Sequence, residues 1–562
     1  MRRKILFVSL ILIFVLGCQI GSAAVPTRTP LPPTGTPTVT VPPTATWEAT
    51  PTATVTDFEI RVHPDGGLFV GDQLSFEVIA PSGVPINDEE NLEVITESGE
   101  VLGATSFAPF GIGNRQQATL RWIWDTSGLQ PGPHEVTFAI PSQNVRWTET
   151  ITLRPRSELA AWQREAAWAM AESECCTFYY ITNTASERDK IDWLFGAQEQ
   201  AEQVATLMDT SFTQPVEITL MPRVLGHGGF ASGEIYISYL DRNYAGSAFD
   251  FVLHHEMVHI LDARLGGELR PTILAEGLAV YLTGGHFKPE PLIPRAAALL
   301  ELTHPETGLN WYLPLRPLTD NFYTSQHEIG YLQAGALVEF MVETWGWEAF
   351  LSFYRDIEPA EDGTHSQAIE NALQEHFDLS LARLEARFLE RLRAEEIAPE
   401  NKRDVRLVVT YYDNVRRYQQ ILDPSAYFLA AWLPRGPEMR QRGIVADLLR
   451  HPTEAENLVF ETMLVAVDEY LRAARYDKAE TAIEAVEAAL DALEAGQAKP
   501  FQAHPLAADH AAIVRLLLEQ DYHPQQIMVQ GQRATAEVSQ DGQELESLQL
   551  SRVQAVWRID LE

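Results

Sequence analysis

The stretch that decides the fold is FVLHHEMVHIL, residues 251–261, in which His255, Glu256 and His259 form an HExxH motif. Its apolar residues supply the body of a helix, which we expect to end near the Gly266-Gly267 pair. Two histidines four residues apart lie on one face of a helix, roughly 5–6 Å apart at Cβ, so they can bind one metal ion. Glu256 directly follows the first histidine and is placed to reach a water molecule beside the metal instead of binding the metal.

A second apolar segment, ILAEGLAVYL at residues 273–282, carries Glu276, 17 residues after His259. A glutamate in the middle of an apolar helix is costly to bury without a partner, and a metal ion is such a partner. Two imidazoles and one carboxylate leave the fourth position of a tetrahedral zinc site open to water, as catalytic zinc sites require. The sequence therefore predicts a zinc ion held by His255, His259 and Glu276.

Other polar residues near these motifs are weaker candidates. His254 is turned about 100° away from His255 on the helix, so we do not expect it to be a ligand. His327 begins a run similar to the motif but has no second histidine after it. His286 follows the helix of Glu276, and we expect a surface histidine, with a place in the cleft as the alternative. Asp262 either orients a ligand imidazole, caps the helix or forms a salt bridge.

The two motifs and their surroundings resemble the gluzincin-type zinc metallopeptidases of the peptidase-MA-like family. The match includes GGFASG at residues 228–233, the strand expected at residues 234–238 and a helix at residues 331–340, and it extends over roughly residues 170–395. The resemblance implies an α+β domain with a mixed sheet and a helical lobe. It also implies that His255, His259 and Glu276 bind zinc, and that Glu256 is the general base that activates water and then protonates the leaving amine.

The resemblance further implies how the substrate binds. The strand at residues 234–238 would be the sheet edge along which an extended peptide pairs. Tyr331 would donate a hydrogen bond to the developing oxyanion, although packing as a helix aromatic explains this residue equally well. The chain lacks the Gly-x-Met-Glu-Asn motif of gluzincin aminopeptidases, and Val280 stands where thermolysin-like enzymes have an aspartate. We therefore expect an endopeptidase.

Two other functions fit the same residues. A non-catalytic cell-surface binding protein on a peptidase-like scaffold would have the same fold, but the intact Glu256 argues against it. A hydrolase of a non-peptide amide would use the same metal chemistry. The main expectation is an extracytoplasmic zinc-dependent metallopeptidase with a peptide or protein substrate.

Residues 1–17 have the features of a lipoprotein signal peptide: a basic start, an apolar run too short to span a bilayer, and VLGC at residues 15–18. This ending resembles the lipobox, which implies that the chain is cut before Cys18 and that Cys18 carries a membrane lipid anchor. The alternative is an ordinary secretory signal cut near residues 21–24. The Pro/Thr-rich linker at residues 18–56 has too few apolar residues to form a core. We expect a membrane-anchored lipoprotein at the cell surface or in the periplasm.

The rest of the chain is predicted to be multidomain. Residues 57–155 carry about seven short alternating runs, which predict a β-sandwich and resemble immunoglobulin-like or fibronectin-like surface modules. We interpret this domain as a spacer, the alternative being a weak binding module. Residues 156–398 hold the metallopeptidase domain. Residues 399–562 are predicted to form a mainly helical accessory domain that ends in a small β-sheet.

Charge and cysteine content narrow the class of protein. The 562 residues include 42 basic and 78 acidic side chains, a formal net charge of −36, which argues against nucleic acid as a partner. Beyond Cys18 only Cys175 and Cys176 remain, so the chain is not a disulfide scaffold. We expect two separate thiols on opposite faces of a strand, with a vicinal disulfide as the alternative.

Overall fold

The computed structural model describes residues 58–560, except 82–85, 87–89, 111–114, 227, 247, 266, 305–306, 429–434 and 541–543. The predicted signal peptide, Cys18 and the linker lie outside the described residues. The chain divides into two compact units, one that ends at Leu159 and one that spans Ala160–Glu562. Among the helices of the described ranges, none has both the length and the apolar character needed to cross a bilayer.

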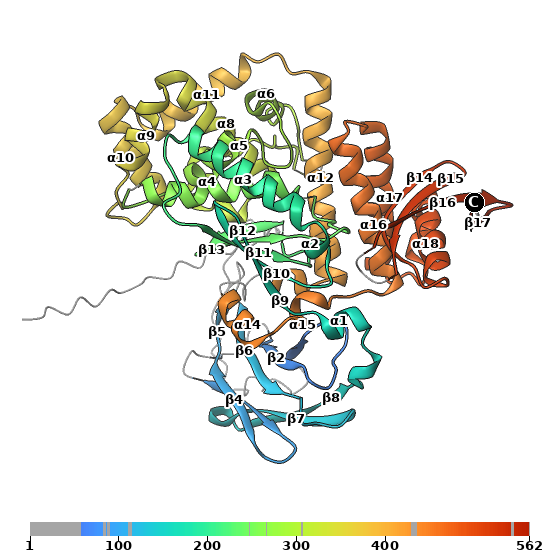
Figure 1. Cartoon of the computed structure of the whole chain (residues 1–562). Helices are drawn as coiled ribbons and strands as arrows, with labels where there is room; N and C mark the ends of the chain where they lie inside the picture. Colours follow the sequence, from blue (N-terminus) through green and yellow to red (C-terminus); the bar gives the residue numbers. More distant parts are fainter. Residues whose placement is uncertain are drawn as a thin grey trace, which may run out of the picture. The chain divides into compact units, whose positions relative to one another are not determined.

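The unit that ends at Leu159 contains two four-stranded antiparallel sheets, ordered β1-β2-β6-β5 and β4-β3-β7-β8 (Figure 1). The inner faces share one core, in which the rings of Phe76 and Phe138 lie 5.5 Å apart in an edge-to-face contact. Two antiparallel sheets around one such core form a β-sandwich. The strands are β1 (Glu59–His63), β2 (Gln73–Ile79), β3 (Asn91–Thr96), β4 (Val101–Ser106), β5 (Ala108–Phe110), β6 (Arg115–Asp125), β7 (Gly132–Ile140) and β8 (Val145–Leu153).

The second unit begins with a mixed five-stranded sheet, ordered β12-β13-β11-β10-β9. Strands β10, β11 and β13 are mutually parallel, and the two outer strands are antiparallel to their neighbours. Helix α3 (Lys190–Leu207) connects β10 to β11 and places Trp193 against Phe178 of the sheet, with ring centroids 4.4 Å apart. The strands are β9 (Trp168–Glu172), β10 (Cys176–Ile181), β11 (Val216–Met221), β12 (Gly229–Ser232) and β13 (Glu234–Ser238).

The prediction that residues 234–238 form the sheet edge is wrong. Strand β13 is an inner strand, and β12 pairs with it as the outermost strand of the order. Gly233, with a φ of +78°, turns the chain back so that the glycine-rich run before it becomes a strand. A side chain at Gly229 would collide with Val252 of the helix that carries the HExxH motif, so this glycine lets β12 lie close to that helix.

The expectation of two separate thiols is also wrong, because a disulfide joins Cys175 to Cys176. Strand β10 begins only at Cys176, and Cys175 lies in the bend before it. The alternation of side chains along a strand therefore does not separate the two sulfur atoms.

A group of helices follows the sheet and contains the two motif segments. Helices α5 and α8 approach each other closely: a side chain at Gly277 would collide with the backbone of Ala334, and one at Gly335 would collide with Val280. Both helices are almost completely buried along this contact. The helices are α4 (Phe249–Leu265), α5 (Thr272–Thr283), α6 (Leu292–Ala298), α7 (Leu315–Asp320), α8 (His327–Trp345), α9 (Trp347–Arg355), α10 (His365–Phe377) and α11 (Leu381–Arg393).

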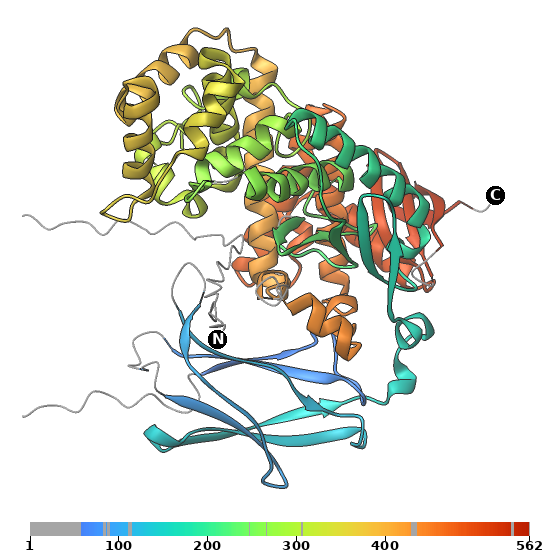
Figure 2. The ribbon, with the colours of Figure 1, turned by 60° about the vertical axis from the view of Figure 1, so that its left-hand side comes forward.

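The C-terminal part is mainly helical and ends in a small antiparallel sheet, ordered β14-β15-β16-β17, as predicted. In Figures 1 and 2 its long first helix, α12 (Pro399–Leu422), runs between the helices around α6 and α8 and the pair α16–α17, and it contacts all four. The other elements are α13 (Ser425–Phe428), α14 (Gly436–Arg442), α15 (Ala446–Leu449), α16 (Ala455–Arg472), α17 (Tyr476–Glu494), α18 (Pro505–Leu518), β14 (His523–Gln530), β15 (Arg533–Ser539), β16 (Glu546–Val553) and β17 (Val556–Ile559).

We predict that Gly277→Ala destabilises the protein by about 1–3 kcal/mol, because the new methyl group would lie 2.5 Å from the carbonyl oxygen of Ala334. Helix propensity alone predicts the opposite sign, since alanine is favoured over glycine inside a helix. Urea unfolding followed by circular dichroism measures the change. Gly128→Ala is the control, because nothing lies within 4 Å of the added Cβ there. A Gly277→Ala protein as stable as the wild type would show that α5 and α8 do not approach this closely.

Candidate metal centre

Helix α4 brings the HExxH residues to the interior through its apolar face. Leu253, Met257 and Leu261, spaced four residues apart, are fully buried in the core. Two residues along a helix correspond to about 200° of rotation, so His255 and His259 lie on the opposite face of α4, and this face meets Glu276 of α5. As the apolar run at residues 273–282 predicted, Glu276 lies on a helix, and its side chain meets the two histidines.

The three polar side chains point their ligating atoms at one another. Nε2 of His255 and Nε2 of His259 are 3.2 Å apart, and Oε2 of Glu276 is 3.3 Å from the first and 3.2 Å from the second. This nearly equilateral triangle of donor atoms can hold one metal ion. The structure thus brings together all three residues that the sequence predicted to be ligands.

Tyr323 holds the other oxygen of the Glu276 carboxylate, and sequence reasoning missed it. Its hydroxyl donates a hydrogen bond of 2.9 Å to Oε1 of Glu276, leaving Oε2 directed at the histidines. Tyr323 lies in a short 3-10 helix, Phe322–Thr324, 47 residues beyond Glu276. No motif surrounds it, so its role follows only from the folded chain.

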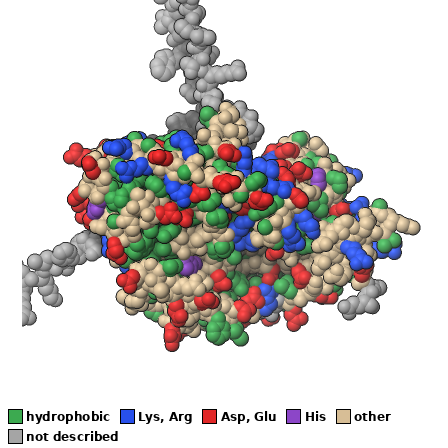
Figure 3. Space-filling model, turned by 90° about the horizontal axis from the view of Figure 1, so that it is seen from above, with side chains coloured by type: hydrophobic (Ala, Val, Ile, Leu, Met, Phe, Trp, Pro, Cys, Tyr) green, Lys and Arg blue, Asp and Glu red, His purple; other side chains and the backbone are tan. Residues whose placement is uncertain are grey.

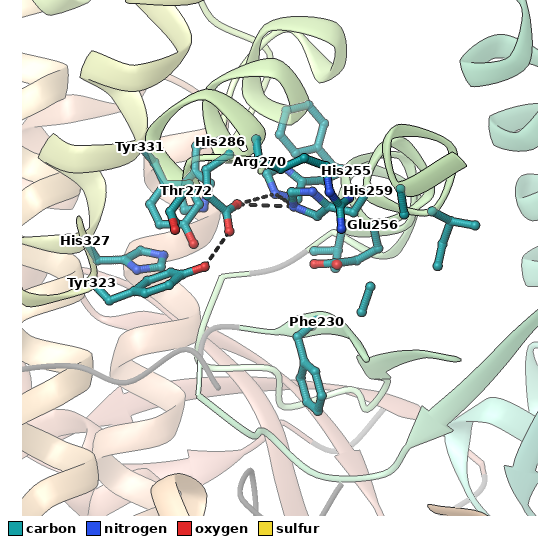
Figure 4. Close-up of a pocket in the computed structure, with 18 of the residues that line it drawn as sticks. Phe230, His255, Glu256, His259, Arg270, Thr272, His286, Tyr323, His327 and Tyr331 are labelled. Atoms are coloured by element: carbon teal, nitrogen blue, oxygen red, sulfur yellow. Dashed lines mark hydrogen bonds and ion pairs between the residues drawn. The ribbon is translucent and has the colours of Figure 1, made fainter. Parts of the chain in front are cut away.

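Glu256 lies beside the donor triangle on the side of the edge strand. Its carboxylate accepts a backbone hydrogen bond from Ala231 of β12. Figure 4 shows Glu256 facing the side where Phe230 of the same strand lies. Burial raises the pKa of Glu256 to about 7.

The charges of the triangle depend on one another. Burial lowers the pKa of His255 to about 4. Burial also disfavours a charge on His259, but the Glu276 carboxylate outweighs this effect and raises the pKa of His259 to about 9. Burial disfavours ionised Glu276 as well, yet the charge of His259 and the hydrogen bonds from both histidines lower its pKa. In the metal-free protein the positive charge of protonated His259 therefore compensates the negative charge of the buried Glu276 carboxylate.

A second group of polar side chains lies next to the triangle and includes His286. The prediction that His286 lies on the surface is therefore wrong. Nδ1 of His286 and Oε1 of Glu328 are 2.6 Å apart, and the His286 ring stacks on Tyr331 with centroids 4.2 Å apart. Gly285, whose φ of +152° suits glycine, makes the sharp turn that directs His286 back into the protein. His286, His327 and Glu328 also have the composition of a metal site. The 2.6 Å separation is instead that of a charge-assisted hydrogen bond.

The structure places the remaining candidates as follows. Tyr331 is buried on α8, and its ring centroid is 6.3 Å from that of His255, so its role as a hydrogen-bond donor stays a prediction. His254 points away and contacts Gln200, in agreement with its exclusion as a ligand. Asp262 forms the salt bridge, with Arg270 at 3.2 Å, and also accepts a hydrogen bond from Tyr354.

One cleft of about 600 Å³ is lined by the donor triangle and by Glu256, Tyr323, His286, His327 and Tyr331. One wall is β12, including Phe230 and Ala231, and the bottom is formed by α4 and α5. Figure 4 shows His286, Tyr323, His327 and Tyr331 gathered on one side of His255 and His259. Tyr412 of α12 also lines the cleft, which the sequence did not indicate. On the face seen in Figure 3, acidic and basic side chains are interspersed.

No protein-family model matches this chain, and no curated protein sequence does so either. The site is therefore interpreted from its own geometry.

We predict that the affinity for a divalent cation depends on pH. A metal must displace the proton of His259, so affinity should rise about tenfold per pH unit from about pH 6 to about pH 8 and become constant above about pH 9. His255, with a pKa of about 4, contributes nothing in this range. Competition titrations against a chelating dye measure the affinity. The His254→Ala control should behave as the wild type. An affinity independent of pH would contradict the paired state of His259 and Glu276.

Proposed function

We propose that the chain is a gluzincin-type zinc metallopeptidase that hydrolyses peptide bonds in its substrate, with Glu256 as the general base. The observation that carries this proposal is the triangle of donor atoms from His255, His259 and Glu276, with Glu256 beside it. As whole residues, His255, Glu256 and Glu276 are less than a tenth exposed, and His259 is partly exposed. Such a concentration of ionisable groups at the bottom of a cleft is expected at a catalytic site.

The donor set fits zinc. Zinc binds imidazole nitrogen and carboxylate oxygen at about 2.0–2.2 Å in tetrahedral geometry, for which the distance between two ligand atoms is about 3.3–3.6 Å. The three separations in the structure are 3.2–3.3 Å. His255, His259 and Glu276 would occupy three corners, and the fourth would face the cleft. Tyr323 would hold the Glu276 carboxylate in place through Oε1.

When bound, zinc would polarise the scissile carbonyl group and lower the pKa of water in the site to about 7. Glu256 is positioned on the cleft side of the histidines, where it can take a proton from the attacking water. The same carboxyl group can then pass this proton to the leaving amine. Burial of the site excludes bulk water, which strengthens these interactions.

The edge strand β12 is the proposed platform for the substrate. Its inner side pairs with β13, and Phe230 and Ala231 line the cleft. An extended peptide can add to such an edge by backbone hydrogen bonds, which position the scissile bond without selecting a sequence. This mode of binding supports an endopeptidase acting on extended segments of a peptide or protein.

We further propose that the enzyme acts outside the cytoplasm, anchored through a lipid on Cys18. The support is the signal-like start, the lipobox-like ending and the Pro/Thr-rich linker of the sequence. In this proposal the β-sandwich is an immunoglobulin-like or fibronectin-like spacer between anchor and catalytic unit.

The decisive test compares the purified wild type with Glu256→Gln. We expect about one zinc per chain in both proteins, and peptide-library hydrolysis in the variant reduced about 10²- to 10⁴-fold, since only the base is lost. Metal analysis and mass spectrometry of the products measure the two properties. Stoichiometric zinc without hydrolysis of any peptide by the wild type would favour a non-peptide amide substrate or a binding protein. Absence of stoichiometric zinc at neutral pH would refute the mechanism.

Tyr331 is the predicted donor to the oxyanion. Tyr331→Phe keeps the ring beside His286 and removes only the hydroxyl group, so we expect kcat to fall about 10²-fold with unchanged zinc content. Steady-state kinetics on a cleaved peptide measure this effect. An unchanged kcat would show that the hydroxyl group takes no part. His286 would then be the next donor to test, because its Nδ1 is held by Glu328 and its ring lies in the cleft.

A further inference from the structure

The cleft continues from the metal group into an end lined by aromatic rings. The ring centroids of His255 and His286 are 6.0 Å apart, and those of His286 and His327 are 4.8 Å apart. The ring centroid of Tyr412 is 6.0 Å from that of His327. Phe287 contacts Tyr412 edge to face at 5.9 Å. All these residues line the same cleft.

Tyr412 belongs to α12, in the part of the chain that the sequence predicted to be an accessory domain. Buried and partly buried bonds join this helix to the segments that contain Gly246 and Phe287 of the cleft. Lys288 is 2.7 Å from Asp404, and the hydroxyl group of Tyr411 donates 2.8 Å to the backbone oxygen of Tyr244. Arg295 also pairs with Asp404. Breaking a buried ion pair leaves an uncompensated charge, so α12 is a fixed wall of the cleft.

Gly246 lines the cleft with a φ of +75°, and a Cβ there would come within about 3 Å of the rings of Phe287 and Tyr411. Glu268, Arg270 and Thr272 also line the cleft.

We propose that the end formed by Tyr412, His327 and Phe287 is a subsite for an aromatic or large aliphatic side chain of the substrate, and that Tyr412 determines this specificity. The inference rests on the proposed peptidase function. Aromatic rings at the wall favour an apolar side chain, and edge-to-face contact adds preference for an aromatic one. The C-terminal part thus supplies part of the substrate-binding surface.

The test measures binding separately from catalysis. The Glu256→Gln protein, loaded with zinc, is titrated with fluorescein-labelled eight-residue alanine-rich peptides, each with one phenylalanine at a different position. We expect one position to improve binding about 10- to 100-fold over the peptide without phenylalanine. Adding Tyr412→Ala should remove this improvement, so that the phenylalanine peptide binds no better than the parent peptide does. Tyr412→Phe should retain it.

Tyr411→Ala is the matched control, since Tyr411 is the neighbouring buried tyrosine of α12 but does not line the cleft. An equal loss in Tyr411→Ala would show a structural role and overturn the proposal. Absence of a phenylalanine preference in the Glu256→Gln protein would overturn it too. Failure of the peptidase proposal is recognised separately, by zinc-loaded wild type that cleaves none of these peptides whether or not they bind.

Discussion

The structure depends on one constraint, the convergence of a buried carboxylate with two imidazoles between α4 and α5. Glu276 lies on an otherwise apolar helix, and its charge would be costly to bury alone. The histidines of α4 and the hydroxyl group of Tyr323 surround it, so each carboxylate oxygen has a partner. The close approach of α5 and α8 at Gly277 fixes the position of α5 and, with it, the position of the Glu276 carboxylate. The sheet, the helical lobe and the cleft are arranged around that meeting point.

The C-terminal part is joined to this arrangement by more than chain connectivity. Its core includes Tyr244 and Phe287, which belong to segments near the metal group. Buried ion pairs, such as Arg223 with Asp423, connect the two parts at sites fully removed from water. Separating the two parts would leave each of these buried charges without its partner. The helices beyond residue 398 and the five-stranded sheet therefore belong to one compact unit. The aromatic end of the cleft is a consequence of this union.

Each of the three predictions that the structure corrected failed at a local turn or bend of the chain. Gly233 folds the glycine-rich run back as an edge strand, which moved the edge from β13 to β12. Gly285 turns His286 into the cleft, although a histidine after a helix end is more often exposed. The bend at Cys175 allows the adjacent sulfur atoms to bond. Hydrophobic periodicity identifies helices and strands well. Reversals of chain direction depend instead on single glycines or bends, whose direction is set by the packing around them.

By itself, the sequence determined which residues form the candidate site: His255 and His259 at helical spacing, the glutamate between them and Glu276 in a second apolar helix. These are properties of helical periodicity, so no long-range information was needed. It also indicated the β-sandwich and the terminal sheet through alternation along the chain. Only the tertiary structure decided that Tyr323, His286 and Tyr412 join this site, because their separations along the chain carry no periodic signal. Their positions follow from how helices pack, which depends on the whole core at once.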